Sequence, residues 1–404
     1  MISVCQIGGR MQYAVARIFD SDKLLNNLYT DICFDKFPFS MIAELNLFSK
    51  FSTNRRVNIS TKHIVHFPFL AFQYYINSKK AKSLNLDYQN YLWMEKRFSN
   101  VVLNYLDSDN AQFLYTFNTA SYHIGKHQSE KKIILEQCSL PFGQYREKIL
   151  NEFQKYAEWC IPNSLDVLMN ESVEQFIEHE REEWIDAEFI IAPSESVKNS
   201  LIMEGVDQSK ILNIPYGINI VNNVDIVDQM EKKKAKPFTI STIGYLELRK
   251  GIHHFLNVAK VYPGAKFKAI GQLGYNMSEQ KVLELNKFVE LTGHLDRNEL
   301  YKEFQCMHVL LFLTIGEGSA TVIYEALSLG IPVITTKEAG SIVEHEKSGF
   351  IVEPDNTPLI VHYIEKLRDQ DYYHYVSLNA LERSRFGSFN AYKERLLENL
   401  TFVK

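Results

Sequence analysis

The stretch Val309-Leu-Leu-Phe-Leu-Thr-Ile-Gly-Glu-Gly-Ser-Ala-Thr-Val-Ile-Tyr-Glu-Ala-Leu-Ser-Leu-Gly-Ile-Pro-Val-Ile-Thr335 predicts a strand, a tight loop, a helix and a second strand. The unbroken apolar run 309–313 is typical of a parallel strand that is covered on both faces. We expect a helix over about 320–329, because a glycine follows it and Pro332 lies just beyond. Strand, helix and strand in this order indicate an α/β fold.

Two carboxylates stand out in this unit. Glu317 lies in the loop between the strand and the helix, and Glu325 lies in a helix that is otherwise apolar nearly all round. Such a helix is buried, and a carboxylate is rarely buried without a partner. Glu325 therefore either pairs with a neighbouring structural group or binds a ligand beside Thr321 and the anion-binding helix N-terminus.

Length and composition favour a packed protein of two domains or one large α/β domain. The chain has 404 residues, 46% of them hydrophobic and 23% charged, and a net charge of −5 that argues against a nucleic-acid binder. Its five cysteines include no CxxC pair, so neither a zinc site nor a disulfide framework is indicated, and reduced thiols in a cytoplasmic protein are expected. We find no signal-peptide pattern and no apolar run of about 18 residues that would span a membrane.

The N-terminal half offers candidate ligand-binding positions after its expected strands. A short strand over 2–7 runs into Gly8-Gly9, which is either a ligand loop or an ordinary tight turn. Later strands precede His123 and end at Glu136. Because the carboxyl ends of parallel strands face the ligand crevice, His123 and Glu136 are candidate catalytic residues, although a lone histidine on a helix is more often structural.

The stretch 62–82 combines aromatic side chains with lysines. It predicts either contact with a membrane surface or a core helix followed by a solvated charge run. The polar stretch 221–236 with its run of lysines predicts a domain boundary. After it, a strand over 238–243 precedes Arg249-Lys250-Gly251, where two cations suit a diphosphate or form a plain surface pair.

These motifs together resemble the GT-B glycosyltransferases of family 4, the group 1 type. The pair Glu317 and Glu325 has the family's Glu-x7-Glu spacing, and the resemblance covers about 189–354. Five further segments match in order: Ser194–Asn199, Ile214–Asn219, Gly244–Gly251, Thr292–Leu295 and Ile342–Val352.

The resemblance implies two Rossmann-like domains with parallel sheets that face a central cleft. We expect an acceptor-side N-terminal domain over 1–218, a linker over 219–236 and a nucleotide-sugar-binding domain over 237–385. Residues 386–404 are expected to form a C-terminal helix that packs back on the first domain.

The resemblance also implies roles for individual residues. The residue matching Glu325 binds the ribose hydroxyls, the one matching Glu317 faces the donor sugar, and the one matching Lys250 contacts the diphosphate. The catalytic candidates are therefore Glu317 and Lys250 from the resemblance, together with Glu136 and His123 from their positions after strands. The implied donor-binding set is Gly8, Gly9, Arg249, Lys250, His294, Glu317, Gly318, Ser319, Ala320, Thr321, Val322 and Glu325.

The sequence departs from the family pattern at two positions. Tyr245 stands where the family has an arginine, and Arg249 is our hypothesis for the compensating cation. Glu136-Gln137 stands where the family often has a histidine near the reacting sugar, so Glu136 or His123 is expected to make the acceptor contact.

The expected function is transfer of a sugar from a nucleotide-sugar donor to a glycan, a lipid-linked or another acceptor, as in bacterial surface polysaccharide synthesis. The resemblance implies retention of configuration and neither a cofactor nor a metal. We expect a cytoplasmic protein, peripheral at the inner face of the membrane if the 62–82 stretch binds it, and no nucleic-acid partner. A GT-B nucleotide-sugar epimerase and a non-catalytic GT-B scaffold protein stay open as alternatives.

Overall fold

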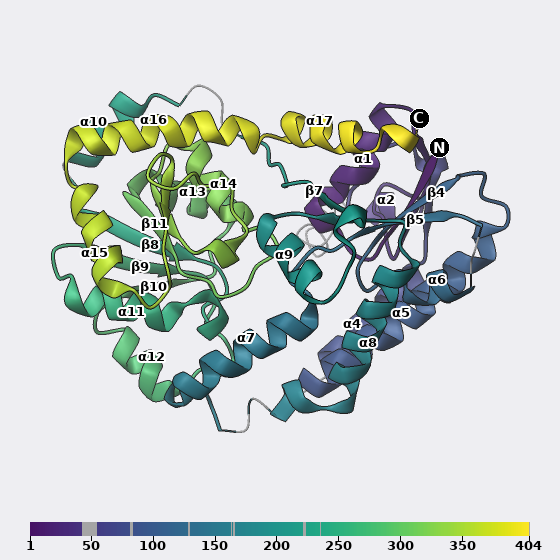
Figure 1. The fold of residues 1–404 in the computed structure, drawn as a ribbon, viewed down its shortest axis with the longest axis horizontal. Helices are drawn as coiled ribbons and strands as arrows, with labels where there is room; N and C mark the ends of the chain where they lie inside the picture. Colours follow the sequence, from purple (N-terminus) through teal and green to yellow (C-terminus); the bar gives the residue numbers. More distant parts are fainter. Residues whose placement is uncertain are drawn as a thin grey trace.

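The computed structural model describes residues 1–403 except 43–54, 81–83, 128–129, 163, 165, 221–223 and 235. Two all-parallel sheets form its two layered halves (Figure 1). The first has the order β3-β2-β1-β4-β5-β6-β7 and the second the order β10-β9-β8-β11-β12-β13. The expectation of two Rossmann-like domains with parallel sheets is therefore confirmed.

The strands are short and their central members are buried. In the first sheet Val4 pairs with Tyr115, and in the second Leu310 pairs with Val333. The strands of the first sheet are β1 (Ile2–Gln6), β2 (Leu25–Thr30), β3 (Ile64–His66), β4 (Phe113–Phe117), β5 (Lys132–Glu136), β6 (Phe189–Ala192) and β7 (Ile211–Asn213). Those of the second are β8 (Thr239–Ile243), β9 (Lys266–Ile270), β10 (Glu290–Gly293), β11 (Val309–Phe312), β12 (Val333–Thr335) and β13 (Gly349–Ile351).

Helices connect the strands and cover both sheets (Figure 1). Before β8 the chain forms α1 (Ala14–Ser21), α2 (Phe39–Ile42), α4 (Pro68–Lys80), α5 (Leu84–Leu106), α6 (Tyr122–His127), α7 (Phe142–Lys155), α8 (Glu171–Asp186), α9 (Glu195–Met203) and α10 (Ile226–Lys234). After β8 it forms α11 (Ile252–Val261), α12 (Glu279–Leu285), α13 (Arg297–Cys306), α14 (Thr321–Ser328), α15 (Thr357–Lys366), α16 (Gln370–Phe386) and α17 (Phe389–Asn399). The helix α10 thus lies within the stretch expected as a linker.

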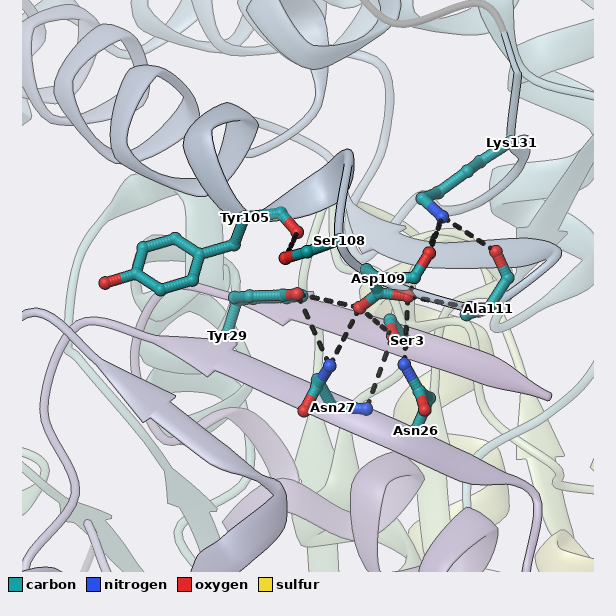
Figure 2. A network of polar contacts seen from close by, with 9 residues as sticks. All are labelled: Ser3, Asn26, Asn27, Tyr29, Tyr105, Ser108, Asp109, Ala111 and Lys131. Carbon is teal, nitrogen blue, oxygen red and sulfur yellow. Dashed lines mark hydrogen bonds and ion pairs between the residues drawn. The ribbon is translucent and has the colours of Figure 1, made fainter.

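A buried carboxylate ties the amino ends of the central strands of the first sheet. Figure 2 shows Asp109, just before β4, accepting from Ser3 Oγ and Tyr29 Oη at 2.7 Å each, from Asn27 at 3.0 Å and from the amide of Ala111 at 2.8 Å. Burial by itself raises the pKa of Asp109, but these hydrogen bonds outweigh it and hold the pKa below the usual value. The network lies at the opposite end of the strands from their carboxyl ends.

The exposure of side chains on α4 contradicts one of the two interpretations of the stretch 62–82. Of the α4 side chains only Ala71 is buried, whereas Phe69 is 88% exposed and Phe72 is 64% exposed. The interpretation of this stretch as a core helix is therefore wrong for Phe69, Phe72 and Tyr75, whereas Phe67 and Tyr74 are partly buried. Lys82 lies outside the described residues. In the described part of the chain, no helix is both long and apolar enough to cross a membrane.

Residues of α7 and of the segment between α7 and α8 pack with the second sheet although they follow β5 of the first. Ile149, Phe153 and Leu168 belong to the same buried cluster as the side chains of β11 and α11. Cys160 forms an antiparallel bridge with Met277. The core of the second half therefore includes residues that the expected boundary at 218 assigns to the first domain.

The chain crosses between the halves at two points that lie side by side. The amide of Ile218 donates to Gly387 O at 2.9 Å, and the amide of Phe389 donates to Ile218 O at 2.8 Å. Beyond the crossing, Tyr392 and Leu396 of α17 pack in the buried cluster of β1 and β4. In Figure 1, α16 and α17 run nearly end to end from the second sheet to the first.

Gly217 is required where the two crossings meet. A Cβ atom added there would overlap Ser388 O and the side chain of Tyr392. We predict that Gly217→Ala lowers the free energy of unfolding by about 1–3 kcal/mol, the usual cost of overpacking. Denaturant unfolding measures this change in the free energy of unfolding. The matched control is Gly143→Ala in α7, where an added Cβ meets only ordinary contacts, so that equal losses in both variants would contradict the prediction.

Candidate functional site

Glu317 joins two cations where β8 and β11 end. Its Oε1 atom contacts both Arg249 Nη1 and Lys250 Nζ. All three side chains are partly buried, with 17% of the Glu317 side chain, 20% of Arg249 and 16% of Lys250 exposed. Because β8 and β11 are neighbours in a parallel sheet, the loops after them lie at one edge, and that edge holds the candidate site.

The Lys250 side chain packs closely against Gly244, at the start of the loop that carries it. A Cβ added to Gly244, whose φ is +143°, would lie 3.6 Å from Lys250 Cε. The ammonium group also lies 5.1 Å from the centre of the Phe312 ring. Burial lowers the pKa of Lys250, although the carboxylate of Glu317 acts in the opposite direction. A partly desolvated ammonium group of this kind attracts an anion more strongly than one in water does.

The guanidinium group of Arg249 donates hydrogen bonds to other residues of the protein. Its Nε atom donates to Glu247 Oε1 at 2.9 Å, and its Nη1 atom donates to Gly316 O at 3.3 Å and to Glu317. Burial alone would lower the pKa of Arg249, but Glu317, Tyr145 and Glu247 together outweigh it and the pKa is raised. Arg249 is therefore placed to orient the Glu317 loop, and its use as a replacement for the cation missing at Tyr245 stays a prediction.

The helix α14 begins at the same edge, with Ala320 as the residue before it and without a side-chain cap. The first amides of an α-helix have no partner within the helix, so those of Thr321 and Val322 can bind an anion. Ser319 Oγ instead lies 2.7 Å from Tyr324 Oη.

The partly buried carboxylate of Glu325 has an ion-pair partner, but the interaction is weak. Arg297 Nη2 lies 3.3 Å from Glu325 Oε1, and the Arg297 side chain is 83% exposed. Burial raises the pKa of Glu325, and Arg297 only partly offsets it. Because an exposed ion pair contributes little, the carboxylate is free to exchange this partner for a ligand.

Loops of the first sheet close over the Glu317 loop. A Cβ on Gly318 would overlap Cys138 O, and Ser194 Oγ donates to Gly318 O at 2.6 Å. A Cβ on Gly316 would lie 3.1 Å from Leu140 Cδ1. The two halves of the molecule therefore meet at this loop, and glycine at 318 is what permits the approach.

Gly8 and Gly9 lie at the end of β1 in the first sheet. Gly8 has a φ of +83°, and its amide donates to Asp31 Oδ1 at 3.1 Å. Asp31 in turn pairs with Arg55 at 2.6 Å. The Gly-Gly turn is thus held by a buried carboxylate.

Arg10 is a cation at this edge that the sequence argument missed. It is exposed, and its pKa is raised chiefly by Cys138 and also by Glu136. Cys138 is the residue whose carbonyl oxygen abuts Gly318. A positive side chain directly after a glycine pair at a strand end was the available sequence signal.

Glu136 is buried, which is a correction to its expected contact with an acceptor. Only 1% of it is exposed, and its carboxylate accepts from the hydroxyl groups of Tyr115 and Tyr216, the latter at 2.6 Å. Burial raises its pKa. The side chain faces the packed layer that contains Tyr392, so it supports the core rather than the cleft.

His123 and His294 do not join the Lys250–Glu317 contact either. The His123 ring lies 5.6 Å from that of His179 in the layer of α5, α6 and α8, and burial lowers its pKa to about 4. The catalytic prediction for His123 therefore lacks support from its position. His294 is exposed in the loop after β10.

The comparison with protein families matches residues 224–383 to the family described as glycosyl transferases group 1. CapM of Staphylococcus aureus, a capsular polysaccharide biosynthesis glycosyltransferase, is 29% identical over 239 residues, which are 53% of this chain and 62% of CapM. The UDP-Gal:alpha-D-GlcNAc-diphosphoundecaprenol alpha-1,3-galactosyltransferase of Escherichia coli is 26% identical over 208 residues, which are 46% of this chain and 52% of that protein. The match thus spans less than two thirds of either relative.

Solved structures resemble the whole described chain. Anabaena Alr3699/HepE in complex with UDP has a TM-score of 0.63 at 15% identity and covers 99% of both chains. Sucrose-phosphate synthase from Thermosynechococcus elongatus has a TM-score of 0.65 at 15% identity and covers 100% of this chain and 99% of its own. At such low identity the likeness concerns the fold, and that fold is GT-B.

We predict that Glu136→Gln lowers the free energy of unfolding by about 1–3 kcal/mol, because an amide cannot accept from both phenols and leaves a buried polar group unpaired. Chemical denaturation measures the change. Glu174→Gln is the control, because that carboxylate is 59% exposed in a surface pair with Arg146. Unchanged stability of the Glu136 variant would show that the buried network does not need the charge.

Proposed function

We propose that this chain, whose residues 224–383 belong to the glycosyl transferases group 1 family, transfers a sugar from a nucleotide-sugar donor to a glycan or lipid-linked acceptor. The observation that carries the proposal is the contact of Lys250 and Arg249 with Glu317. This group lies beside the uncapped N-terminus of α14. Cations, free amides and a carboxylate at one sheet edge suit a diphosphate joined to a sugar.

In the proposed complex the donor is bound by groups with separate tasks. Lys250 and the amides of Thr321 and Val322 bind the diphosphate, and Lys250 stabilises the charge that develops on it as the bond to the sugar breaks. Glu317 faces the sugar, and Glu325 exchanges Arg297 for the two ribose hydroxyls. The support for Lys250 is that its ammonium group is already partly desolvated, which strengthens its attraction to phosphate.

Retention of configuration and independence of a catalytic metal are the finer parts of the proposal. Their support is the family resemblance and a cationic site that supplies the charge otherwise provided by a metal ion. Arg10 is a further cation for the diphosphate from the first sheet, since it adjoins Cys138 at the meeting point with Gly318. Added Mg²⁺ or Mn²⁺ should leave the rate unchanged.

The proposed class of acceptor is taken from the names of the two relatives. One is named for capsular polysaccharide biosynthesis and the other for a diphosphoundecaprenol acceptor. For this chain we propose a polysaccharide or lipid-linked acceptor, approached from the side of the first sheet.

Exposed aromatic side chains on α4 support the proposal that this protein contacts the membrane, where a lipid-linked acceptor would lie. Phe69, Phe72 and Tyr75 of α4 are 88%, 64% and 51% exposed, and they recur at a spacing of three, which places them on one side of the helix. Lys79 and Lys80 follow in its last turn. Apolar rings followed by ammonium groups suit the interface of an anionic bilayer.

The donor prediction concerns Lys250 and Glu325. A panel of UDP-, GDP- and ADP-sugars tested for turnover should yield one active donor, and Lys250→Ala should reduce kcat/KM by about 10²–10³. Glu325→Ala should weaken binding of the free nucleotide about 10-fold through the lost ribose contact. Lys260→Ala is the control, since that lysine lies in the last turn of α11 and pairs with Glu284 of α12.

Two outcomes would decide against the transferase. Absence of binding and turnover with every donor would favour the scaffold alternative, and conversion of the donor sugar to its epimer would favour the epimerase. An unaffected Glu325 variant would contradict the ribose contact alone.

The membrane prediction is that vesicles rich in phosphatidylglycerol sediment the protein, and that Phe69→Ser with Phe72→Ser reduces the bound fraction at least several-fold, because buried aromatic area is lost. Ile185→Ser is the control, an exposed apolar residue of α8. Equal sedimentation of both variants would exclude α4 as the contact.

A further inference from the structure

Three metal-ligating side chains converge where α7 meets α11, away from the proposed donor site. His253 Nε2 and His254 Nε2 lie 2.6 Å and 2.7 Å from the same oxygen atom, Glu152 Oε1. The imidazoles are 0% and 2% exposed and the glutamate is 8% exposed. Neighbouring residues on a helix normally point about 100° apart, so two adjacent histidines directed at one atom form an arrangement that needs an explanation.

The other ring nitrogens carry no competing interaction. The Nδ1 atoms of His253 and His254 are buried and, among the described residues, have no hydrogen-bond partner. Each ring therefore meets a polar group of the protein only through Nε2. The nitrogen and oxygen atoms that could act as ligands all lie within 4.8 Å of one another.

The protonation states also suit ligands. Burial alone would raise the pKa of Glu152, but hydrogen bonds from both histidines outweigh it and lower the pKa to about 2. Burial lowers the pKa of His253 to about 4. At neutral pH the group is a carboxylate beside a neutral imidazole, which is the state in which these side chains bind metals.

We propose that Glu152, His253 and His254 bind one divalent transition-metal ion of the zinc type and thereby fasten α7 to α11. Two imidazoles and one carboxylate form a ligand set that zinc accepts, with water in the remaining position. Metal bonds of about 2.0–2.2 Å fit these side chains after a small separation of the present hydrogen-bonded atoms. The ion takes the Nε2 lone pair of each neutral ring, so the ring proton that now lies on Nε2 moves to Nδ1 and no net proton is released from the histidines.

The place of the site in the fold gives the ion a structural role. Glu152 belongs to α7, which follows β5 of the first sheet, whereas α11 begins directly after Lys250 and Gly251. A metal bound here links the two halves and holds the helix on which Lys250 depends. This inference does not rest on the proposed transferase activity, because metal binding is measured without any donor.

A second group of three potential ligands provides an internal comparison. His179 Nδ1 lies 2.8 Å from Glu95 Oε2, and His123 completes the group. His123 is only half-buried, and the His179 ring stacks on Tyr122 with 3.7 Å between ring centres. These features give no convergence on one atom, so the proposal concerns the Glu152 group alone.

The test is titration of the full-length, chelator-treated and dialysed protein with Co²⁺, whose visible d–d absorption reports a site of low coordination number. We expect one equivalent to give this absorption and Zn²⁺ to displace it. Glu152→Gln, which preserves shape, and His253→Gln should abolish it. His123→Gln and His308→Gln should retain it, the latter being a buried histidine that accepts from the amide of Thr239 at 3.0 Å.

Two results would overturn the proposal: no absorption with the wild-type chain, or absorption that is lost in His123→Gln and kept in Glu152→Gln. If the Glu152 variant fails to fold, X-ray absorption at the zinc edge of the wild-type protein decides. Two imidazoles with oxygen ligands support the site, and any other histidine number refutes it.

Discussion

The carboxylate of Glu317 is the contact on which the candidate site depends. Without it, Arg249 and Lys250 would place two partly buried positive charges side by side, which a low-dielectric environment penalises strongly. With it, the loops after β8 and β11 are joined by ionic contacts as well as by their neighbouring strands. The arrangement keeps the ammonium group of Lys250 next to the start of α14, with Glu247 and Glu317 as the carboxylate partners of the two cations.

A second constraint fixes this edge relative to the first sheet. Gly318 packs against the backbone of Cys138 and accepts a hydrogen bond from Ser194, so the two halves touch at the same loop that carries Glu317. The halves also exchange segments, since Ile149 and Phe153 enter the second core while Tyr392 and Leu396 enter the first. Separating the two halves must therefore deform several packed contacts and cannot be a free hinge motion.

Polar groups in this molecule divide into those that support packing and those that can still bind a ligand, and the degree of burial and hydrogen bonding separates them. Asp109 and Glu136 are buried and accept from hydroxyl or amide donors inside the first half. Glu325, with one exposed arginine partner, keeps that capacity. Exposure places Phe69, Phe72 and Tyr75 of α4 outside the core.

The sequence by itself determined the periodic and local features. The apolar run 309–313 and the glycine after position 329 were enough to predict β11, α14 and β12, because buried parallel strands and helix ends depend on nearby residues. The spacing of Glu317 and Glu325 and the cations at 249 and 250 likewise located one edge of the site. Only the tertiary structure decided that Glu136 is buried beneath Tyr115 and Tyr216, that Arg10 adjoins Cys138, and that Glu152 meets His253 and His254. Those outcomes depend on contacts between residues that are 21 to 128 positions apart in the chain, which no local pattern specifies.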